Sequence, residues 1–513
     1  MERPFGKDRV CGVIAAGTAR EMIFEMRRGL RITRTLELRL DYLRNARERT
    51  AYLSWLGRQR PRAMLIATCR SRQGGGLFRG NRKAQLEILA QAVRAGCRWC
   101  DVEIETASHA SPAELRSALS PARVMVSHHD FRKTPKSLPA IARRLLRAGG
   151  RIAKVATQCH SISDSVRICS LARGRRDTVA IPMGEIGLAG RVLSLRAGSA
   201  LAYAAVEQAT APGQLSLDAM EHLYRAADIT RRTRVYGVIG NPIGHSLSPL
   251  LHNTAFRARR FDAVLVPFLV RDLGDFLRAI EPFGIAGFGV TIPHKEIILR
   301  HLSDCDPLAA RIGAVNTVVV RRGGGLYGYN TDYAGVLRSL QRRMCLAGSR
   351  VLLYGAGGAA RAAAFALAQA GATVCLSARR PERARALARA VGAQVVTRAG
   401  LRREFFDAIV NCTPVGMHPR GGSPLGSAEL NCRIVMDMVY RPRTTELLRR
   451  ARRRGIEIIS GLEMFLEQGF AQYEIWTGER APEAAMRRAV TMALEREEKS
   501  QGRRSRRALP VNR

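Results

Sequence analysis

The chain contains very little lysine. Of its 84 basic residues only seven are lysine, at positions 7, 83, 133, 136, 154, 295 and 499. Arginine stays protonated and suffices for charge, whereas lysine can lose its proton, attack a carbonyl or relay a proton. Lys154 and Lys295 follow short apolar, strand-like runs. We therefore predict that these two lysines carry chemistry rather than surface charge.

Long apolar runs are also missing, and the cysteines are odd in number and scattered along the chain. No segment approaches the roughly 18 apolar residues of a membrane-spanning helix, and the first eight residues lack the apolar block of a signal peptide. We therefore expect a cytoplasmic protein without a membrane partner. The 11 cysteines form no disulfide framework. The isolated pair Cys97 and Cys100 has no second pair or nearby histidine, so we expect reduced thiols and no metal.

Acidic residues are about half as numerous as basic ones, which gives a net charge of +41. Such a charge permits nucleic-acid binding, because cations gain affinity by releasing phosphate counterions. The arginines are scattered over helix-like segments, however, and only 497–513 is typical of a basic, disordered tail. We therefore favour anionic small molecules as partners and do not expect a nucleic acid. The oligomeric state stays open.

A chain of 513 residues should divide into two to four domains. In the first 230 residues, β-rich runs alternate with amphipathic stretches, at 10–15, 35–40, 63–69, 98–105, 123–127, 152–156, 178–183 and 199–204. Eight such repeats predict an α/β fold with an N-terminal (β/α)8 barrel. The active site of a barrel lies where strands end. Polar residues gather at those ends: Glu37, Arg39, Asp41, Arg70, Asp101, Glu103, Glu105, His128, His129, Asp130, Lys154, Arg191, Thr210 and Gln214.

This set combines a lysine, histidines and arginines without an evident metal site. A Schiff-base lysine explains it, since neighbouring cations such as Arg70 and Arg191 would favour the neutral amine of Lys154. A histidine could then remove a proton from the carbon next to the imine. The arginines would hold a carboxylate and hydroxyls through directional hydrogen bonds.

The motifs 37–41, 68–70, 127–131, 152–154 and 211–214 resemble type I 3-dehydroquinate dehydratase over about 215 residues. The resemblance implies that Lys154 forms an imine with 3-dehydroquinate and that His129 takes the C2 proton. It also implies that substrate is held by Glu37, Arg39, Arg70, Arg191, Thr210 and Gln214. His128 should point the opposite way, because neighbouring residues on a strand face opposite sides.

Two positions depart from that pattern. Gly74 stands where the family usually has an acidic residue before paired glycines, and Thr210 replaces a serine while keeping a hydroxyl. The acidic residue belongs to a loop that covers substrate in relatives. Its loss leaves the lysine chemistry intact, but raises the alternative that the barrel is impaired or serves as a scaffold.

The second half also alternates strands and helices, with a hairpin predicted around 323–325. A second unit starts at 350, where a strand leads through Gly355-Ala-Gly357-Gly358-Ala359 into a helix. That arrangement offers a helix N-terminus to a pyrophosphate. The next strand ends at Ala378-Arg379-Arg380, and cations there favour a 2′-phosphate. We therefore predict a Rossmann domain that binds NADP rather than NAD.

Seven motifs in this half resemble shikimate dehydrogenase over about 260 residues: 244–249, 290–295, 313–317, 330–332, 411–417, 437–440 and 461–468. The resemblance implies that Lys295 and Asp332 form the catalytic pair and that Thr413 contacts the cofactor. It implies substrate contacts by Ser246, Ser248, Thr291, Asn316 and Gln468. Independently, a lysine beside a carboxylate can give a proton to the alkoxide left by hydride transfer. The family usually has Asn-Arg-Thr where this chain has 378–380.

The two resemblances together predict a fused enzyme in which the product of the first half, 3-dehydroshikimate, is the substrate of the second, which makes shikimate. We expect a dehydratase barrel over 8–226, a substrate-binding domain over 231–337, and a Rossmann domain over 338–464. Helices in 465–496 should pack back on the substrate-binding domain. Shikimate versus quinate preference, channelling and the reason for the large charge stay open.

Overall fold

The structure is a computed structural model that describes residues 4–6, 8–211, 213–417 and 421–507, with side chains described up to 499. Contacts divide the chain into two compact units. One unit holds 1–235 and 262–285, and the other holds 236–261 and 286–513.

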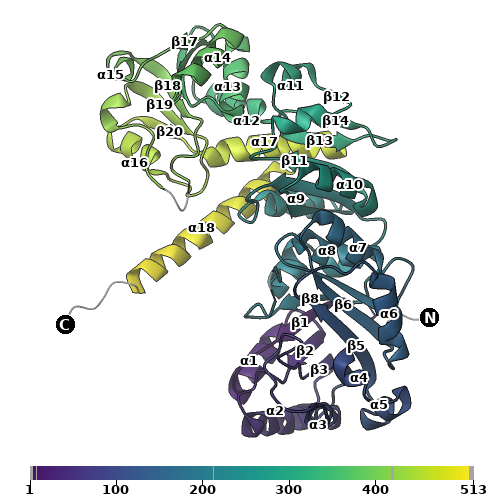
Figure 1. The fold of residues 1–513 in the computed structure, drawn as a ribbon. Coiled ribbons are helices and arrows are strands. Elements are labelled where there is room, and N and C mark those ends of the chain that lie inside the picture. Colours follow the sequence, from purple (N-terminus) through teal and green to yellow (C-terminus); the bar gives the residue numbers. More distant parts are fainter. Residues whose placement is uncertain (1–3, 7, 212, 418–420, 508–513) are drawn as a thin grey trace, which may run out of the picture. The chain divides into compact units, whose positions relative to one another are not determined.

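The first unit contains the predicted barrel (Figure 1). Its parallel sheet has the order β7-β6-β5-β4-β3-β2-β1-β8. The start of the eighth strand approaches the seventh, because Ala200 N donates to Thr178 O at 2.9 Å. The ring is therefore nearly closed, and the predicted (β/α)8 architecture is confirmed. Its strands are β1 Val10–Ile14, β2 Thr35–Arg39, β3 Met64–Thr68, β4 Trp99–Glu103, β5 Arg123–Asp130, β6 Ile152–Gln158, β7 Thr178–Met183 and β8 Ala202–Ala205.

The barrel helices begin where the sequence provides caps. The Thr18 hydroxyl accepts from Glu21 N at 3.3 Å and Thr18 N donates to the Glu21 carboxylate at 3.1 Å, so the two residues form a capping box. Trp99, Met125 and Ile152 pack in the core inside the ring. The helices are α1 Ala19–Gly29, α2 Ala46–Gln59, α3 Arg82–Arg94, α4 Ile104–Ala107, α5 Pro112–Ala118, α6 Leu138–Arg147, α7 Ile162–Ser170 and α8 Leu188–Ala197, followed by the short turns Ala219–Leu223 and Ala226–Asp228.

A six-stranded sheet follows, in the order β10-β9-β11-β13-β14-β12. Its strands are β9 Arg234–Gly240, β10 Ala263–Leu269, β11 Ile285–Val290, β12 Asp304–Cys305, β13 Thr317–Val320 and β14 Leu326–Tyr329. The last two form an antiparallel hairpin that pairs Val320 with Leu326, as predicted. The associated helices are α9 Ser248–Ala258, α10 Leu273–Phe283, the turn Ile297–His301, α11 Pro307–Ile312 and α12 Asp332–Gln341. Strand β10 and helix α10 group with the barrel in the contact division.

The third sheet is parallel, in the order β17-β16-β15-β18-β19-β20. The order reverses at β15, so the loop after this strand lies at the crevice where such folds bind ligands. The strands are β15 Arg350–Tyr354, β16 Thr373–Ser377, β17 Gln394–Val395, β18 Phe406–Asn411, β19 Cys432–Asp437 and β20 Glu457–Ile459. The helices are α13 Gly358–Gln369, α14 Pro381–Val391, α15 Gly400–Arg403, the turn Ser427–Glu429 and α16 Glu446–Arg453, and apolar cores cover both faces of the sheet.

The chain ends in two helices, α17 Gly461–Thr477 and α18 Glu483–Arg507. Helix α17 packs on α12 and α9, and α18 packs on α9 (Figure 1). The predicted disordered tail began at 497, yet the helix continues to Arg507. Ion pairs of Glu495 with Arg443 and of Glu497 with Arg441 lie where the tail was predicted to begin. Residues 508–513 lie outside the described residues. No helix among the described residues has the length and apolar character needed to span a membrane.

Candidate functional sites

Lys154 lies inside the barrel between two carboxylates. Its Nζ donates to Asp101 Oδ2 at 2.7 Å and to Glu37 Oε1 at 3.0 Å. The ammonium also lies 3.9 Å from the centre of the Tyr203 ring. Only 4% of the lysine side chain is exposed. Such burial excludes a surface lysine that serves only solubility, and the two carboxylates explain how a buried amine is tolerated.

His129 joins the same cluster through Arg70. The guanidinium of Arg70 donates to Asp101 Oδ2 at 2.8 Å, to Ser127 Oγ at 3.2 Å and to His129 Nδ1 at 3.1 Å. Because arginine is only a donor, Nδ1 of this imidazole accepts and its proton is on Nε2. The sequence therefore selected the histidine that faces the lysine cluster, whereas His128 has Glu105, Asp130 and Arg144 as its charged neighbours.

Burial and charge set the protonation states in this cluster. Burial, reinforced by Arg70 and Lys154, holds the pKa of His129 well below its ordinary value, so the ring is neutral. Burial alone would raise the pKa of Asp101, but Arg70 and Lys154 outweigh it and hold that pKa far below its usual range. The site therefore contains a neutral base next to a permanently ionised carboxylate.

The other predicted residues of the barrel are placed around this cluster. Arg39 is buried and pairs with Asp41 through two hydrogen bonds of 2.8 and 3.0 Å. Arg191 is buried on α8 near Cys159, and burial lowers its pKa to about 10. Thr210 and Gln214 contact each other in the loop after β8, where the Thr210 hydroxyl donates to Gln214 Oε1 at 3.1 Å.

The loop around Gly74 explains the departure from the family pattern in physical terms. A Cβ atom at Gly74 would lie 1.7 Å from Glu103 Oε1. The Glu103 carboxylate instead holds this loop, since it accepts from Ser71 N at 2.9 Å and from Ser71 Oγ at 3.0 Å. It also accepts from Gln85 Nε2 at 2.7 Å. Glu103 thus occupies the space that a side chain at position 74 would need.

Sequence reasoning did not assign site roles to Asp101, Ser127 or Tyr203. Asp101 did appear among the polar residues at strand ends, so a signal existed. Ser127 lies on the strand of His129, two residues earlier, and therefore on the same face. Its hydroxyl donates to Asp101 Oδ1 at 2.5 Å. Tyr203 on β8 offered no signal beyond its aromatic character.

A second site lies in the other unit, where Lys295 meets Asp332. Lys295 Nζ donates to Asp332 Oδ2 at 2.5 Å. The lysine side chain is 20% exposed and the carboxylate 8%, so the pair is accessible at one end. Asn316 Nδ2 donates to the other carboxylate oxygen at 2.8 Å. The predicted pair and its neighbour Asn316 are therefore brought together.

The Asn330-Thr331-Asp332 segment is fixed by a buried hydrogen-bond network. Asn316 Oδ1 accepts from Thr331 N at 2.7 Å, and Asn330 Nδ2 donates to Ala314 O at 2.8 Å. Gln472 Nε2 donates to Asn316 O at 3.2 Å. This network sets Asp332 at the start of α12 with a fixed orientation. Sequence reasoning missed Gln472, which follows the predicted Gln468 by one helical turn.

The remaining substrate-site candidates lie on neighbouring elements of this unit. Ser246 Oγ accepts from Ser248 N at 3.2 Å at the start of α9, and both serines are partly exposed. Thr291 is partly exposed directly after β11. Gln468 is 8% exposed on α17, and its Nε2 donates to Phe465 O at 2.8 Å.

The glycine-rich loop after β15 has the geometry of a nucleotide loop. Gly355 has φ = +128°, which disfavours other residues, and its backbone N donates to Ser377 O at 2.8 Å. A Cβ at Gly357 would meet no atom within 4 Å, so the backbone is open there, at the N-terminus of α13. Gly358 and Ala359 form the first turn of that helix. Thr413 borders the loop, with its Cγ2 3.1 Å from the position of a Gly355 Cβ.

Arg379 and Arg380 follow β16 at the same edge of the sheet. Both are exposed, and neither has an ion-pair partner among the residues whose side chains the structure describes. Free guanidinium groups next to an open helix N-terminus fit a dinucleotide with an additional phosphate. No group of three or more histidine, cysteine or acidic side chains suited to a metal ion occurs among the described residues.

Three family models match the chain. Residues 10–231 match type I 3-dehydroquinase, residues 238–318 match the shikimate dehydrogenase substrate binding domain, and residues 461–491 match the shikimate 5′-dehydrogenase C-terminal domain. The shikimate dehydrogenase (NADP(+)) of Moorella thermoacetica is 46% identical over 51% of this chain and 94% of that protein. A crystal structure of shikimate 5-dehydrogenase from Thermus thermophilus in complex with NADP(H) and shikimate is 36% identical, with a TM-score of 0.48, over 51% of this chain and 99% of that one.

One relative spans both halves. The chloroplastic bifunctional 3-dehydroquinate dehydratase/shikimate dehydrogenase of Arabidopsis thaliana is 34% identical in an alignment of 499 residues that covers 92% of this chain and 82% of that protein. The match runs through both lysine sites and the glycine-rich loop. The chain therefore belongs to the family of bifunctional 3-dehydroquinate dehydratase/shikimate dehydrogenases.

Proposed function

We propose that the chain catalyses two consecutive steps, dehydration of 3-dehydroquinate to 3-dehydroshikimate in the barrel and NADPH-dependent reduction to shikimate in the second unit. The observation that carries this proposal is the placement of the only two buried or half-buried lysines among the residues with described side chains, each against a carboxylate. The first is suited to covalent catalysis and the second to proton transfer.

In the barrel, Lys154 attacks the ketone of 3-dehydroquinate. Asp101 and Glu37 lie within hydrogen-bond distance of Lys154 Nζ. Asp101 stays ionised and holds the lysine, and Glu37 can take up the amine proton that must leave before attack. Water departs as the imine forms, and the imine acidifies the adjacent C2 hydrogen. His129, neutral because of its lowered pKa, accepts that proton and returns it to the departing C1 hydroxyl, which leaves as water. A water molecule then hydrolyses the imine, which releases 3-dehydroshikimate and regenerates the Lys154 amine.

The polar residues around this centre hold the substrate. Arg39, Arg70 and Arg191 provide directional donors for its carboxylate and hydroxyls, and Glu37, Thr210 and Gln214 complete the set. Arg70 has a double role, since it also contacts His129 Nδ1. Movement of Arg70 towards the substrate would free that nitrogen to accept a proton.

In the second unit, Lys295 supplies the proton that the reduced ketone requires. Bound NADPH provides the hydride. Asp332 holds Lys295 in position, and Asn316 fixes Asp332 through its second carboxylate oxygen. Ser246, Ser248, Thr291 and Gln468 bind the substrate hydroxyls and carboxylate. For the cofactor, Gly355, Gly357, Gly358, Ala359 and Thr413 border the pyrophosphate, and Arg379 with Arg380 bind the 2′-phosphate.

The domain limits and the location belong to this proposal. The barrel domain covers 8–226, the substrate-binding domain 231–337 together with 465–496, and the Rossmann domain 338–464. We propose a cytoplasmic location, whereas the Arabidopsis relative is described as chloroplastic. Small molecules are the partners.

A coupled assay tests the division of labour. Enzyme supplied with 3-dehydroquinate and NADPH should oxidise the cofactor, and neither Lys154→Ala nor Lys295→Ala should do so alone. A mixture of the two variants should recover the overall reaction, because each retains one intact site. Completion of both steps by either single variant would refute the assigned roles.

An alternative is that the barrel is an inactive scaffold, which is motivated by Gly74 at a usually acidic position. Borohydride reduction in the presence of 3-dehydroquinate separates the two possibilities. A covalent adduct at Lys154, absent from Lys154→Ala, would exclude the scaffold. Absence of an adduct in an enzyme that still reduces 3-dehydroshikimate would support it.

A further inference from the structure

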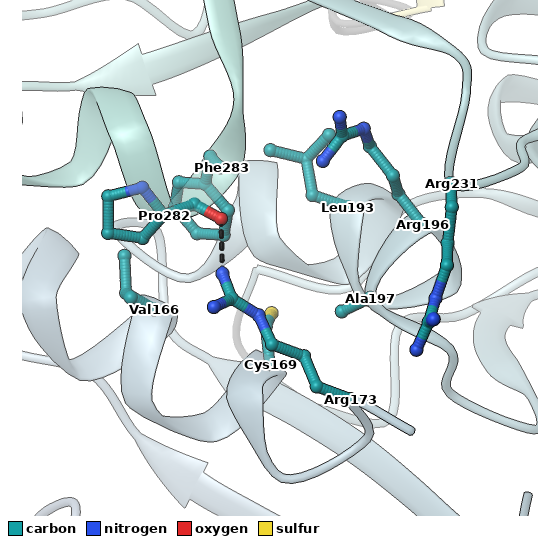
Figure 2. A pocket seen from close by; sticks show the side chains of 9 residues that line it. All are labelled: Val166, Cys169, Arg173, Leu193, Arg196, Ala197, Arg231, Pro282 and Phe283. Atoms are coloured by element: carbon teal, nitrogen blue, oxygen red, sulfur yellow. Dashed lines mark hydrogen bonds between the residues drawn. The ribbon is translucent and has the colours of Figure 1, made fainter. Parts of the chain in front are cut away.

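The first unit contains a cavity of about 430 Å³ away from the barrel mouth. It lies between barrel helices α7 and α8, the segment at Arg231, and the C-terminal end of α10 (Figure 2). None of its lining residues belongs to either proposed active site. Its volume is within the range of roughly 300–1,000 Å³ that is usual for small-molecule sites.

Three arginines line this cavity, and no carboxylate does: Arg173, Arg196 and Arg231. None of them forms an ion pair with any residue whose side chain is described. Arg173 donates one hydrogen bond to Pro282 O, drawn in Figure 2, and Arg196 Nε donates to Thr233 O at 2.9 Å. A guanidinium has five N–H groups, so most donors remain for another molecule.

The positive charge at this place is not compensated. Burial, and next the charge of Arg173, lower the pKa of Arg196. A neighbouring anion would have the opposite effect. An anion in the cavity would therefore relieve the repulsion between these guanidiniums and satisfy their free donors.

The remaining lining of the cavity forms an apolar wall beside the arginines (Figure 2). Leu193 and Phe283 are buried there, and Val166 and Pro282 are partly buried. An inorganic anion would leave this wall without contacts. A ligand with an apolar body would cover it and gain hydrophobic stabilisation.

From this arrangement we propose that the cavity binds an organic anion, a carboxylate or phosphate on an apolar body, with the anionic group facing Arg173, Arg196 and Arg231. The site is additional to the two proposed active sites and does not depend on their chemistry.

Such a ligand would also strengthen the packing of α10 on the barrel helices. Asp275 near the start of α10 accepts from Ile162 N at 2.5 Å and from Ser163 N at 3.2 Å, at the start of α7. At the other end, Arg173 after α7 contacts Pro282 of α10. The cavity lies at this second end, so its occupant would contact both helices. Binding should therefore raise the thermal stability of the first unit.

Calorimetric titration of the full chain tests the proposal, with benzoate and phenyl phosphate as probes and with inorganic phosphate and benzyl alcohol as controls. We expect both probes to bind and each control to bind at least about tenfold more weakly. Inorganic phosphate lacks the apolar body, and benzyl alcohol lacks the anionic group. Equal affinity for inorganic phosphate would show that the apolar wall contributes nothing to binding and would contradict the proposed ligand class. No binding of either probe at millimolar concentration would overturn the proposal.

Variants locate the binding. Arg231→Gln should weaken phenyl phosphate binding about tenfold, as expected for loss of a charge-assisted hydrogen bond. This side chain is exposed, so the change should leave the fold intact. Arg232→Gln, at an exposed neighbour outside the cavity lining, should leave the affinity unchanged. Equal weakening by Arg232→Gln would mean that the general surface charge, and not the cavity, binds the anion. Loss of binding in Arg70→Gln would place the anion in the barrel mouth. Either result would refute the site.

Discussion

Asp101 Oδ2 lies 2.7 Å from Lys154 Nζ and 2.8 Å from Arg70 Nη2, so one carboxylate oxygen joins two buried cations of the barrel. Asp101→Asn would remove the anion that holds both side chains in place. We therefore expect the rate of borohydride trapping at Lys154 to fall about tenfold or more across its pH profile.

The control for that experiment is Glu105→Gln, which removes an exposed carboxylate two residues beyond the same strand. Its trapping profile should match the parent enzyme. The Asp101→Asn protein should also melt at lower temperature, since two buried cations lose an anion. An unchanged trapping profile in Asp101→Asn would contradict an electrostatic role for this carboxylate.

Asp332→Asn tests the second site. The amide preserves the shape that Asn316 and Lys295 contact but not the charge. We expect kcat for 3-dehydroshikimate reduction to fall about a hundredfold or more, because a general acid loses the group that orients it. Dehydratase activity and the exposed control Asp304→Asn should be unaffected. A fall in both activities would indicate general unfolding instead.

Cofactor choice depends on Arg379 in the proposed function. Arg379→Ala should raise the KM for NADPH about tenfold or more and leave the KM for NADH nearly unchanged, since only NADPH carries the 2′-phosphate. Steady-state kinetics with both cofactors measure this. Arg383→Ala, at an exposed position on α14, is the matched control. Parallel increases for both cofactors would show that Arg379 does not recognise the phosphate.

Gly74→Ala should impair the barrel although the change is a single methyl group. The new Cβ would lie 1.7 Å from Glu103 Oε1, so Glu103 must move and release Ser71. We expect a higher KM for 3-dehydroquinate with little effect on reduction. Gly57→Ala places a methyl group 3.8 Å from its nearest neighbour, Ala95 Cα, and should be neutral. Equal kinetic constants for the two variants would show that Glu103 does not position this loop.

The buried His252 should make stability depend on pH. Burial lowers the pKa of its imidazole to about 4, whereas an unfolded histidine titrates near about 6.5. The unfolded chain therefore binds the proton first, and stability falls as pH decreases from about 6.5 towards 4, by about 3 kcal/mol in total.

Melting temperatures across that range measure the effect. His252→Phe keeps a ring beside Phe256 and Trp476 but cannot titrate, so its melting temperature should fall less steeply with decreasing pH. The exposed His109→Asn should keep the parent slope. A parent-like slope in His252→Phe would show that other groups control the acid sensitivity.

Much of the architecture follows from local sequence patterns. The eight β-rich runs before residue 206 predicted the barrel, because the side-chain pattern of a strand is decided within a few residues. The glycine-rich loop was recognisable for the same reason, since Gly355 adopts a positive φ and Gly357 leaves the backbone open. The local signals failed at the chain end, where α18 forms ion pairs through Glu495 and Glu497 and continues to Arg507.

The sequence by itself singled out the two lysines that contact carboxylates, the histidine that joins the cluster of the first lysine, and the glycine-rich loop after β15. Only the tertiary structure decided that Glu37 and Asp101, 117 and 53 residues away, are the direct partners of Lys154. It alone showed that Glu103 fills the space at Gly74 and that three arginines surround a separate cavity. Side-chain direction follows from local backbone geometry, but the distance between two side chains depends on how distant segments pack.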